Sequence, residues 1–249
     1  MLKSVLQRAV LSAPDMRGKT FLLRRIGNAV HDVPDAGRMT LSPIHLIDGY
    51  IIRHGSYAPE LVAEIKHALR NGGDFVDVGA NIGYLSLVAS RMSPSGTVYA
   101  FEPSPRELSS LIENIRLSGA MNVIPFPFAL GTSARTDTLY LQGAENPGMN
   151  TRHGSSGIPT TIRIEKFSDV LTTAMMDRIR CIKIDVEGDE LNVLLGMESE
   201  MHRLNATFIV EVSWPKSAEQ IYAFFDRHGF APKIGIDKKP LDDVFTRKA

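Results

Sequence analysis

The chain has 249 residues, of which 43% are hydrophobic and 22% charged, and its formal net charge is zero. This composition is typical of a globular protein that is long enough to bury a sizeable core. The longest basic clusters, Arg24-Arg25 and Lys238-Lys239, are too short for the electrostatic footprint of a nucleic-acid-binding protein. We therefore expect no DNA or RNA partner.

A single cysteine, Cys181, excludes an internal disulfide framework and is typical of a reducing compartment. It lies in an apolar run, so we interpret it as a small buried hydrophobic side chain rather than a reactive thiol. No apolar stretch approaches the roughly 20 residues that span a bilayer, and we expect no transmembrane segment. The sequence therefore predicts a cytoplasmic protein.

Residues 2–10 place apolar side chains at helical spacing, with Lys3 and Arg8 between them. This pattern predicts a short amphipathic helix rather than the continuous apolar core of a signal peptide. We expect the helix to pack on the domain. Binding to a membrane surface, or to a second copy in a homodimer, is the alternative.

The chain divides into a region that is hard to interpret, residues 1–58, and a regular one, residues 59–249. The first is expected to be a cap of helices and a hairpin, with a turn at 32–37 and a short strand from Leu46 to Ile52. In the second, helices and strands alternate, which indicates βαβ units and a parallel sheet. Its expected helices are 61–69, 85–92, 105–117, 190–197 and 218–227, and its expected strands are 75–79, 97–101, 123–130, 138–141, 179–184, 207–212, 231–236 and 244–247.

Three details refine this α/β prediction. Pro125 and Pro127 interrupt strand 123–130, which suits an edge position. Residues 131–160 are rich in Gly, Asn, Ser and Thr and are expected to form a long functional or mobile loop around one strand. The last two strands are expected to form a hairpin that adds antiparallel edge strands to the sheet.

Glycines mark the turn that follows strand 75–79, in the segment Asp77-Val78-Gly79-Ala80-Asn81-Ile82-Gly83-Tyr84. Gly79 and Gly83 allow a sharp turn and a close approach of the backbone to a ligand. The N–H groups at the start of the next helix favour a carboxylate or a phosphate. Asp77, a carboxylate inside an apolar strand, needs a donor or a cationic ligand group such as an α-ammonium.

Glu102 follows the next strand, about 20 residues after the glycine turn, where an acidic side chain can accept hydrogen bonds from ribose hydroxyls. Glycine turn and acid together indicate an adenosine-containing cofactor, either S-adenosylmethionine or NAD. The glycines are spaced Gly-x-x-x-Gly, whereas a dinucleotide needs Gly-x-Gly-x-x-Gly for its pyrophosphate. The spacing therefore favours S-adenosylmethionine.

Charged residues also surround the end of strand 179–184. Lys183 and Asp185 share one side of the strand, and Asp185 falls at its carboxyl end. An internal ion pair between these two is one interpretation, with the acidic residues that follow favouring a helix N-terminus. Next to a cofactor site, however, a carboxylate at a strand end is a plausible base for a substrate hydroxyl. Glu211, in the next strand, is expected to face the same crevice.

Three segments carry a resemblance to a known family. Residues 75–84 and 98–103 resemble the first two motifs of the FkbM family of methyltransferases, and residues 182–190, continuing to Leu195-Gly196, resemble its most distinctive motif. The match runs in order from about residue 55 to 215. It implies a Rossmann-like class I methyltransferase fold, with a seven-stranded, mostly parallel sheet and an antiparallel seventh strand. It also implies O-methylation of a sugar, a glycolipid or another natural product.

The resemblance also assigns the cofactor site. The turn from Asp77 to Tyr84 would hold the methionine moiety of S-adenosyl-L-methionine, Glu102 the ribose, and Ala129 would lie beside the adenine. The family usually has Thr-Leu-Asp-Asp before its last motif, whereas this chain has Lys166-Phe167-Ser168-Asp169, so the first of those acids has no counterpart. The predicted cofactor-binding residues are Asp77, Gly79, Ala80, Asn81, Gly83, Tyr84, Glu102, Pro103, Ser104 and Ala129.

Methyl transfer to oxygen requires a hydroxyl held in line with the methyl group and a group that accepts its proton. We predict Asp185 as this base, with Glu211 and Glu187 as weaker alternatives and His153, in the long loop, as a further one. A strand-end carboxylate pair that binds a divalent metal is possible, but we predict no metal site. The alternative functions are a non-catalytic cofactor-binding partner or sensor protein and, against the glycine spacing, an NAD-dependent oxidoreductase.

Overall fold

A seven-stranded β-sheet forms the centre of the computed structural model, which describes residues 2–14, 18–142, 157–213 and 215–248. The strand order is β11-β12-β10-β9-β3-β4-β5, and only β12 runs antiparallel to its neighbours. The predicted α/β fold with a mostly parallel sheet is thereby confirmed. The strands are β3 (Asp74–Val78), β4 (Val98–Phe101), β5 (Val123–Phe126), β9 (Ile179–Ile184), β10 (Thr207–Glu211), β11 (Phe230–Pro232) and β12 (Asp242–Arg247).

The two ends of the sheet differ in how well the sequence predicts them. β5 lies at one edge, as its prolines indicate, but the predicted strand 123–130 is in fact two strands. Its second part, β6 (Ala129–Leu130), belongs to another sheet. At the other end the C-terminal hairpin does not simply extend the edge. β12 is inserted between β10 and β11, so that β11 is the edge strand.

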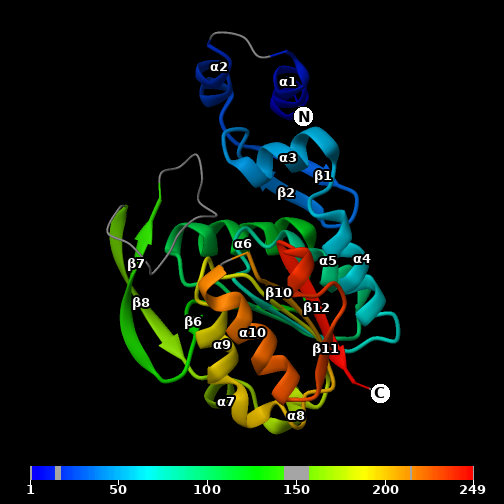
Figure 1. Ribbon diagram of the computed structural model, residues 1–249. Helices are drawn as coiled ribbons and strands as arrows, with labels where there is room; N and C mark the ends of the chain where they lie inside the picture. The colour runs from blue at the N-terminus through cyan, green and yellow to red at the C-terminus, as the bar shows by residue number, and fades with distance from the viewer. Residues whose placement is uncertain (1, 15–17, 143–156, 214, 249) are drawn as a thin grey trace.

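Helices cover both faces of the sheet (Figure 1). One face carries α4 (Pro59–Ala68), α5 (Tyr84–Met92) and α6 (Pro105–Ser118), and the other carries α9 (Glu190–Gly196) and α10 (Pro215–Arg227). Because successive strand residues point to opposite faces, each strand contributes to two separate cores. Cys181 is fully buried in the core beneath α4 and α5. Short helices precede β9 and flank the last strands: α7 (Phe167–Val170), α8 (Thr173–Met176), η2 (Glu198–Glu200) and η3 (Ile236–Lys238).

The N-terminal region contains α1 (Leu2–Ser12), α2 (Lys19–Ile26), a hairpin of β1 (Ala29–Val33) and β2 (Gly37–Leu41), and α3 (Leu46–His54). The hairpin turn lies where the sequence predicts it. The predicted strand from Leu46 to Ile52 is wrong, because this segment is α3. Short apolar runs fit a strand or a buried helix equally well, and the polar contacts at the ends decide between them.

Those contacts are specific in α3. The Asp48 carboxylate accepts a hydrogen bond of 2.8 Å from the backbone N–H of Ser42, just before the helix, and Gly55 ends it at a φ of 79°. Residues of 1–58 and of the following domain share one hydrophobic core, and β2 packs against α6. The division of the chain at residue 58 stays a prediction.

A second sheet projects beside the central one (Figure 1). β7 (Arg135–Leu141) and β8 (Ile158–Glu165) pair antiparallel, and β6 pairs with β8. The predicted strand 138–141 is thereby confirmed as part of β7, whereas β8, which begins at the end of the expected loop, was not predicted. Among the described residues, Leu139, Ile162 and Ile164 form the small core of this sheet, with Ala129 and Leu141 packed against it, so its strands carry too few apolar residues for a clear alternating pattern. No helix among the described residues is long and apolar enough to cross a bilayer.

Candidate cofactor and active site

A pocket opens at the carboxyl ends of β3, β4 and β9, the edge of a parallel sheet where ligands bind in open α/β folds. Two of the predicted cofactor residues, Gly83 and Ser104, are not among the residues that line it. The eight others line it: Asp77, Gly79, Ala80, Asn81, Tyr84, Glu102, Pro103 and Ala129.

The glycine turn after β3 has no room for side chains. At Gly79 (φ 81°), a Cβ atom would lie 1.9 Å from the backbone oxygen of Asp185, which follows β9. At Gly83 (φ 88°), a Cβ atom would lie 2.4 Å from Cδ1 of Leu111 on α6. The two glycines therefore let the turn pass close to β9 and to α6, and they leave the backbone of the turn facing the pocket.

Asp77 is 1% exposed and lies opposite Lys183 in the pairing of β3 with β9. Its Oδ2 accepts a hydrogen bond of 2.6 Å from the Ser86 hydroxyl on α5. Its Oδ1 has no hydrogen-bond partner, although Lys183 Nζ is 3.5 Å away. A buried carboxylate oxygen without a donor, in the wall of a pocket, fits a cationic ligand group such as an α-ammonium.

Glu102, at the end of β4, is also buried. Its two oxygens accept backbone N–H bonds from Asn81 (2.8 Å) and Ser104 (2.9 Å), which fix the orientation of the carboxyl group. Burial raises the pKa of Glu102 to about 7, and these two N–H donors oppose that rise. When it is ionised, each oxygen keeps a further lone pair for a ligand hydroxyl, as a ribose would require.

We expect the affinity for an adenosine ligand to depend on pH through Glu102. If only the ionised carboxyl accepts the ribose hydroxyls, the affinity is full above pH 7 and falls about tenfold between pH 8 and pH 6, as the ionised fraction falls. Calorimetric titration with S-adenosylhomocysteine at both pH values measures this change. Glu102→Gln has no proton to lose, so it should bind the ligand weakly at pH 6 and at pH 8. A tenfold difference in affinity between the two pH values in this variant would contradict the assignment of the pH dependence to Glu102.

Lys183 lies between the carboxylates of Asp77 and Asp185. Its Nζ donates to the backbone oxygen of Gly79 (2.8 Å) and lies 3.6 Å from Oδ2 of Asp185, besides its contact with Asp77. Burial alone would lower the pKa of Lys183, but Asp185 and Asp77 raise it above its ordinary value. The ion pair between Lys183 and Asp185 that the sequence suggests is therefore present, with Asp77 as a second partner.

The three predicted catalytic carboxylates lie in different surroundings. Asp185 lines the pocket with its side chain 42% exposed, and Glu187 lines it as well. Glu211 does not line the pocket, and its carboxylate accepts a hydrogen bond of 2.5 Å from the Ser213 hydroxyl. His153 lies outside the described residues.

Glu187 has the properties of a proton acceptor near neutral pH. Burial, followed by the charges of Asp185 and Glu211, raises its pKa to about 8. Its backbone is in the left-handed region, at a φ of 59°, which is costly for a residue with a side chain and is often found at functional sites. Within the described ranges, no group of three or more His, Cys, Asp or Glu side chains is placed to hold a metal ion.

Part of the pocket comes from outside the central sheet and was not predicted from the sequence. Ile47 of α3 and Tyr57 line it from the N-terminal region, and Leu139 and Ile162 line it from the small sheet. The Tyr57 N–H donates to the Tyr84 hydroxyl (3.1 Å), and the two rings meet edge to face with their centroids 6.3 Å apart. None of these side chains belongs to a motif, so no pattern in the sequence marks them.

This sheet order with one antiparallel strand, the glycine turn and the buried acids at the ends of β3 and β4 define the chain as a class I S-adenosylmethionine-dependent methyltransferase. The family model "Methyltransferase FkbM domain" matches residues 77–232. The chain belongs to this family, as the motifs in the sequence indicate.

Known proteins agree with this assignment. Methyltransferase sdnD of Sordaria araneosa is 30% identical over 187 residues, which cover 62% of this chain and 72% of that protein. The 31-O-demethyl-FK506 methyltransferase FkbM of Streptomyces tacrolimicus is 29% identical over 203 residues, covering 70% and 77%. The crystal structure of methyltransferase FkbM from Methylobacillus flagellatus KT has the same fold, with a TM-score of 0.50 at 14% identity over 80% of this chain and 52% of that one.

Proposed function

We propose that this enzyme transfers the methyl group of S-adenosylmethionine to a hydroxyl oxygen of a small molecule such as a sugar, a glycolipid or another natural product. The observation that carries the proposal is that two buried acids with different surroundings line one pocket. Asp77 has a carboxylate oxygen that accepts no hydrogen bond, and the Glu102 carboxyl group is held in place by two backbone N–H groups. The family relative that acts on 31-O-demethyl-FK506 supports oxygen as the methyl acceptor.

The two acids complement opposite ends of the cofactor. Asp77 would bind the α-ammonium, and Glu102 would accept hydrogen bonds from the ribose hydroxyls. Apolar side chains that line the pocket from β6, β7 and β8, namely Ala129, Leu139 and Ile162, would cover the adenine ring. When bound, S-adenosylmethionine supplies an electrophilic methyl group, so the protein needs only to orient the acceptor and to take its proton.

Among the pocket residues, Glu187 is the proton acceptor that the site favours. From the sequence alone, Asp185 is the first choice of catalytic base. The Asp185 carboxylate is engaged in an ion pair, with its Oδ2 3.6 Å from Lys183 Nζ. Glu187 lines the same pocket and has a pKa of about 8, and a general base works best when its pKa lies near the working pH. Glu211 lies outside the pocket wall.

The charge of the pocket limits the kind of acceptor molecule that can bind there. Asp185 and Asp189 line it together, and Lys183 is the one lysine or arginine among the described lining residues. A phosphorylated or polyanionic acceptor would meet these carboxylates and be repelled. We therefore propose an uncharged acceptor hydroxyl. A cytoplasmic location and a homodimer stay predictions.

Transfer of a radioactive methyl group tests the activity. The enzyme is incubated with S-adenosylmethionine labelled on the methyl group and with uncharged glycosides, glycolipids and polyketide alcohols, and label in the acceptor is counted after base treatment, which removes methyl esters but not methyl ethers. Base-stable label is the expected result. Tight cofactor binding without transfer to any hydroxyl would contradict the enzymatic proposal and favour a sensor or partner protein.

A further inference from the structure

The first helix is turned with its polar side toward the protein. Gln7, in the middle of α1, is fully buried, and its amide group contacts the backbone oxygen of Gly27 and the His31 ring. Arg8 Nε donates to the backbone oxygen of Ile52 (3.1 Å), and Arg53 donates to that of Leu11 (3.0 Å). Hydrogen bonds as well as apolar packing therefore hold α1 in place.

This orientation leaves the apolar stripe of α1 formed by Leu2, Val5 and Leu6 in solvent, whereas the helix itself packs on the domain, as expected, through Val10 and Leu11. Leu2, Val5 and Leu6 are 75%, 60% and 44% exposed. On α2, Phe21 and Leu22 are 65% and 42% exposed. α1 and α2 contact each other and form the N-terminal lobe, which projects from the rest of the molecule (Figure 1). Such a concentration of exposed large apolar side chains usually marks a binding surface.

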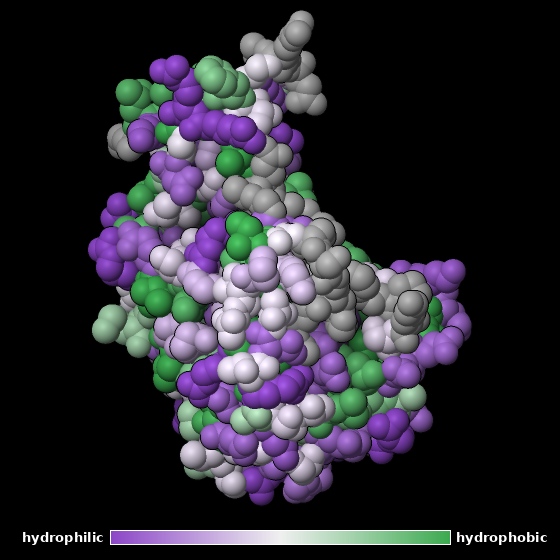
Figure 2. All heavy atoms as spheres, turned by 90° about the vertical axis from the view of Figure 1, so that its left-hand side faces the viewer, coloured by the Kyte–Doolittle hydropathy of each residue, from purple (hydrophilic) through white to green (hydrophobic). Residues whose placement is uncertain are grey.

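The same lobe is strongly basic. Residues 1–31 contain six Lys or Arg residues and one Asp, whereas the whole chain has a net charge of zero. Lys3, Arg24 and Arg25 are exposed on the lobe beside the apolar side chains. Hydrophobic and hydrophilic residues lie side by side on this part of the surface (Figure 2). Apolar side chains next to lysine and arginine on short helices are the combination that binds an anionic bilayer surface.

We propose that the N-terminal lobe binds the surface of a membrane that contains anionic lipids, with Phe21, Leu22 and the apolar stripe of α1 inserted among the acyl chains. Nucleic acid would match the basic charge but not the exposed apolar side chains. A second copy of the lobe would match the apolar side chains, but its equal positive charge would repel. An anionic bilayer matches both the basic charge and the exposed apolar side chains of the lobe.

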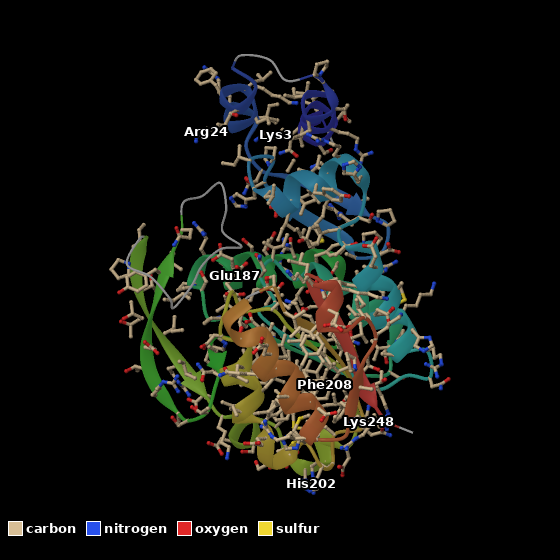
Figure 3. The ribbon with its side chains drawn as sticks, viewed as in Figure 1. Lys3, Arg24, Glu187, His202, Phe208 and Lys248 are labelled. Atoms are coloured by element: carbon tan, nitrogen blue, oxygen red, sulfur yellow. The ribbon has the colours of Figure 1, made fainter. Side chains whose placement is uncertain are left out.

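The lobe lies beyond α3 and the β1–β2 hairpin, on the side of the sheet at which the pocket opens (Figure 1). α1 contacts α3, and Ile47 of α3 lines the pocket. Glu187 lies on this side of the sheet, toward Lys3 and Arg24, whereas His202 lies at the opposite end (Figure 3). An enzyme bound through the lobe therefore has its pocket on the membrane side.

Co-sedimentation of the full chain with vesicles tests the proposal. Vesicles of phosphatidylcholine with 30% phosphatidylglycerol should bind the protein at least about tenfold more tightly than vesicles of phosphatidylcholine alone, and the difference should shrink in high salt. Arg24→Glu with Arg25→Glu, and separately Phe21→Ser with Leu22→Ser, should each weaken binding by about tenfold or more.

The matched control is Lys66→Glu with Arg70→Glu, the same charge reversal on two exposed residues of the α4 region, which should leave vesicle binding unchanged. Equal thermal midpoints and equal binding of S-adenosylhomocysteine show that the variants are folded. The proposal would be overturned if the protein sedimented equally with both vesicle types. It would also be overturned if the control variant lost as much vesicle binding as Arg24→Glu with Arg25→Glu. Self-association of the lipid-free protein that Phe21→Ser with Leu22→Ser abolishes would overturn it too, because the lobe would then be a dimer interface.

Discussion

Glu187→Gln is expected to lower kcat by about 10² to 10⁴, the usual range for removal of a general base, and to leave the cofactor affinity nearly unchanged. In the wild-type enzyme kcat should rise with pH until it levels off above about 8, because the pKa of Glu187 is raised to that value and only its ionised form accepts a proton. The variant should lack this rise. The measurement is initial rate against pH at saturating acceptor, once the methyl-transfer assay has identified one.

Asp185→Asn is the matched control, because it removes one carboxylate charge from the same pocket wall. The charge of Asp185 helps to raise the pKa of Glu187, so its removal should move the rise of kcat to lower pH and preserve most of the activity. The reverse outcome, with Asp185→Asn inactive and Glu187→Gln active, would identify Asp185 as the base.

Gly79→Ala is expected to abolish measurable cofactor binding, a loss of at least about 100-fold, and to lower the free energy of unfolding by about 3 kcal/mol or more. The added Cβ would lie 1.9 Å from the Asp185 oxygen, so the turn after β3 must move away from the end of β9. Asp77 and Lys183 lie on those two strands and must shift with them. Denaturant unfolding and calorimetric titration measure the two effects.

Gly119→Ala is the control that measures the cost of a left-handed backbone conformation without the steric clash that Gly79→Ala introduces. Gly119 has a similar φ of 71° at the end of α6, but a Cβ there meets no atom within 4 Å. This variant should lose only about 1–2 kcal/mol of stability, the cost of a left-handed residue, and should bind the cofactor normally. Equal effects of the two substitutions would show that contact with Asp185 is unimportant.

Much of the cofactor side of the site could be predicted from the sequence, because it depends on local patterns. A glycine turn, an acid inside an apolar strand and an acid at the next strand end all fall at carboxyl ends of neighbouring parallel strands, so that Asp77 and Glu102 must come together. The parallel pairing of the sheet follows from the alternation of helices and strands, whereas the insertion of β12 between β10 and β11 does not.

The acceptor side could not be predicted, because tertiary contacts form it. Tyr57 reaches the pocket by hydrogen bonding to Tyr84, and Glu211 ends beside Ser213 instead of in the pocket wall, although its strand has the pattern of its neighbours. The high pKa of Glu187 arises from burial and from the charges of Asp185, two residues earlier, and of Glu211 on β10. The orientation of α1 depends on tertiary contacts, the hydrogen bonds of Gln7 and Arg8 and the burial of Leu11, which the apolar stripe in the sequence does not reveal.

Calorimetric titration of the full chain with S-adenosylmethionine, S-adenosylhomocysteine and NAD, repeated on Glu102→Ala, tests the central claim most directly. We predict micromolar binding of the first two ligands and none of NAD. Loss of two hydrogen bonds to an ionised carboxyl should weaken binding to Glu102→Ala by about 100-fold. No binding of either adenosyl ligand to the wild-type protein, or equal binding to Glu102→Ala, would contradict the site described for this methyltransferase.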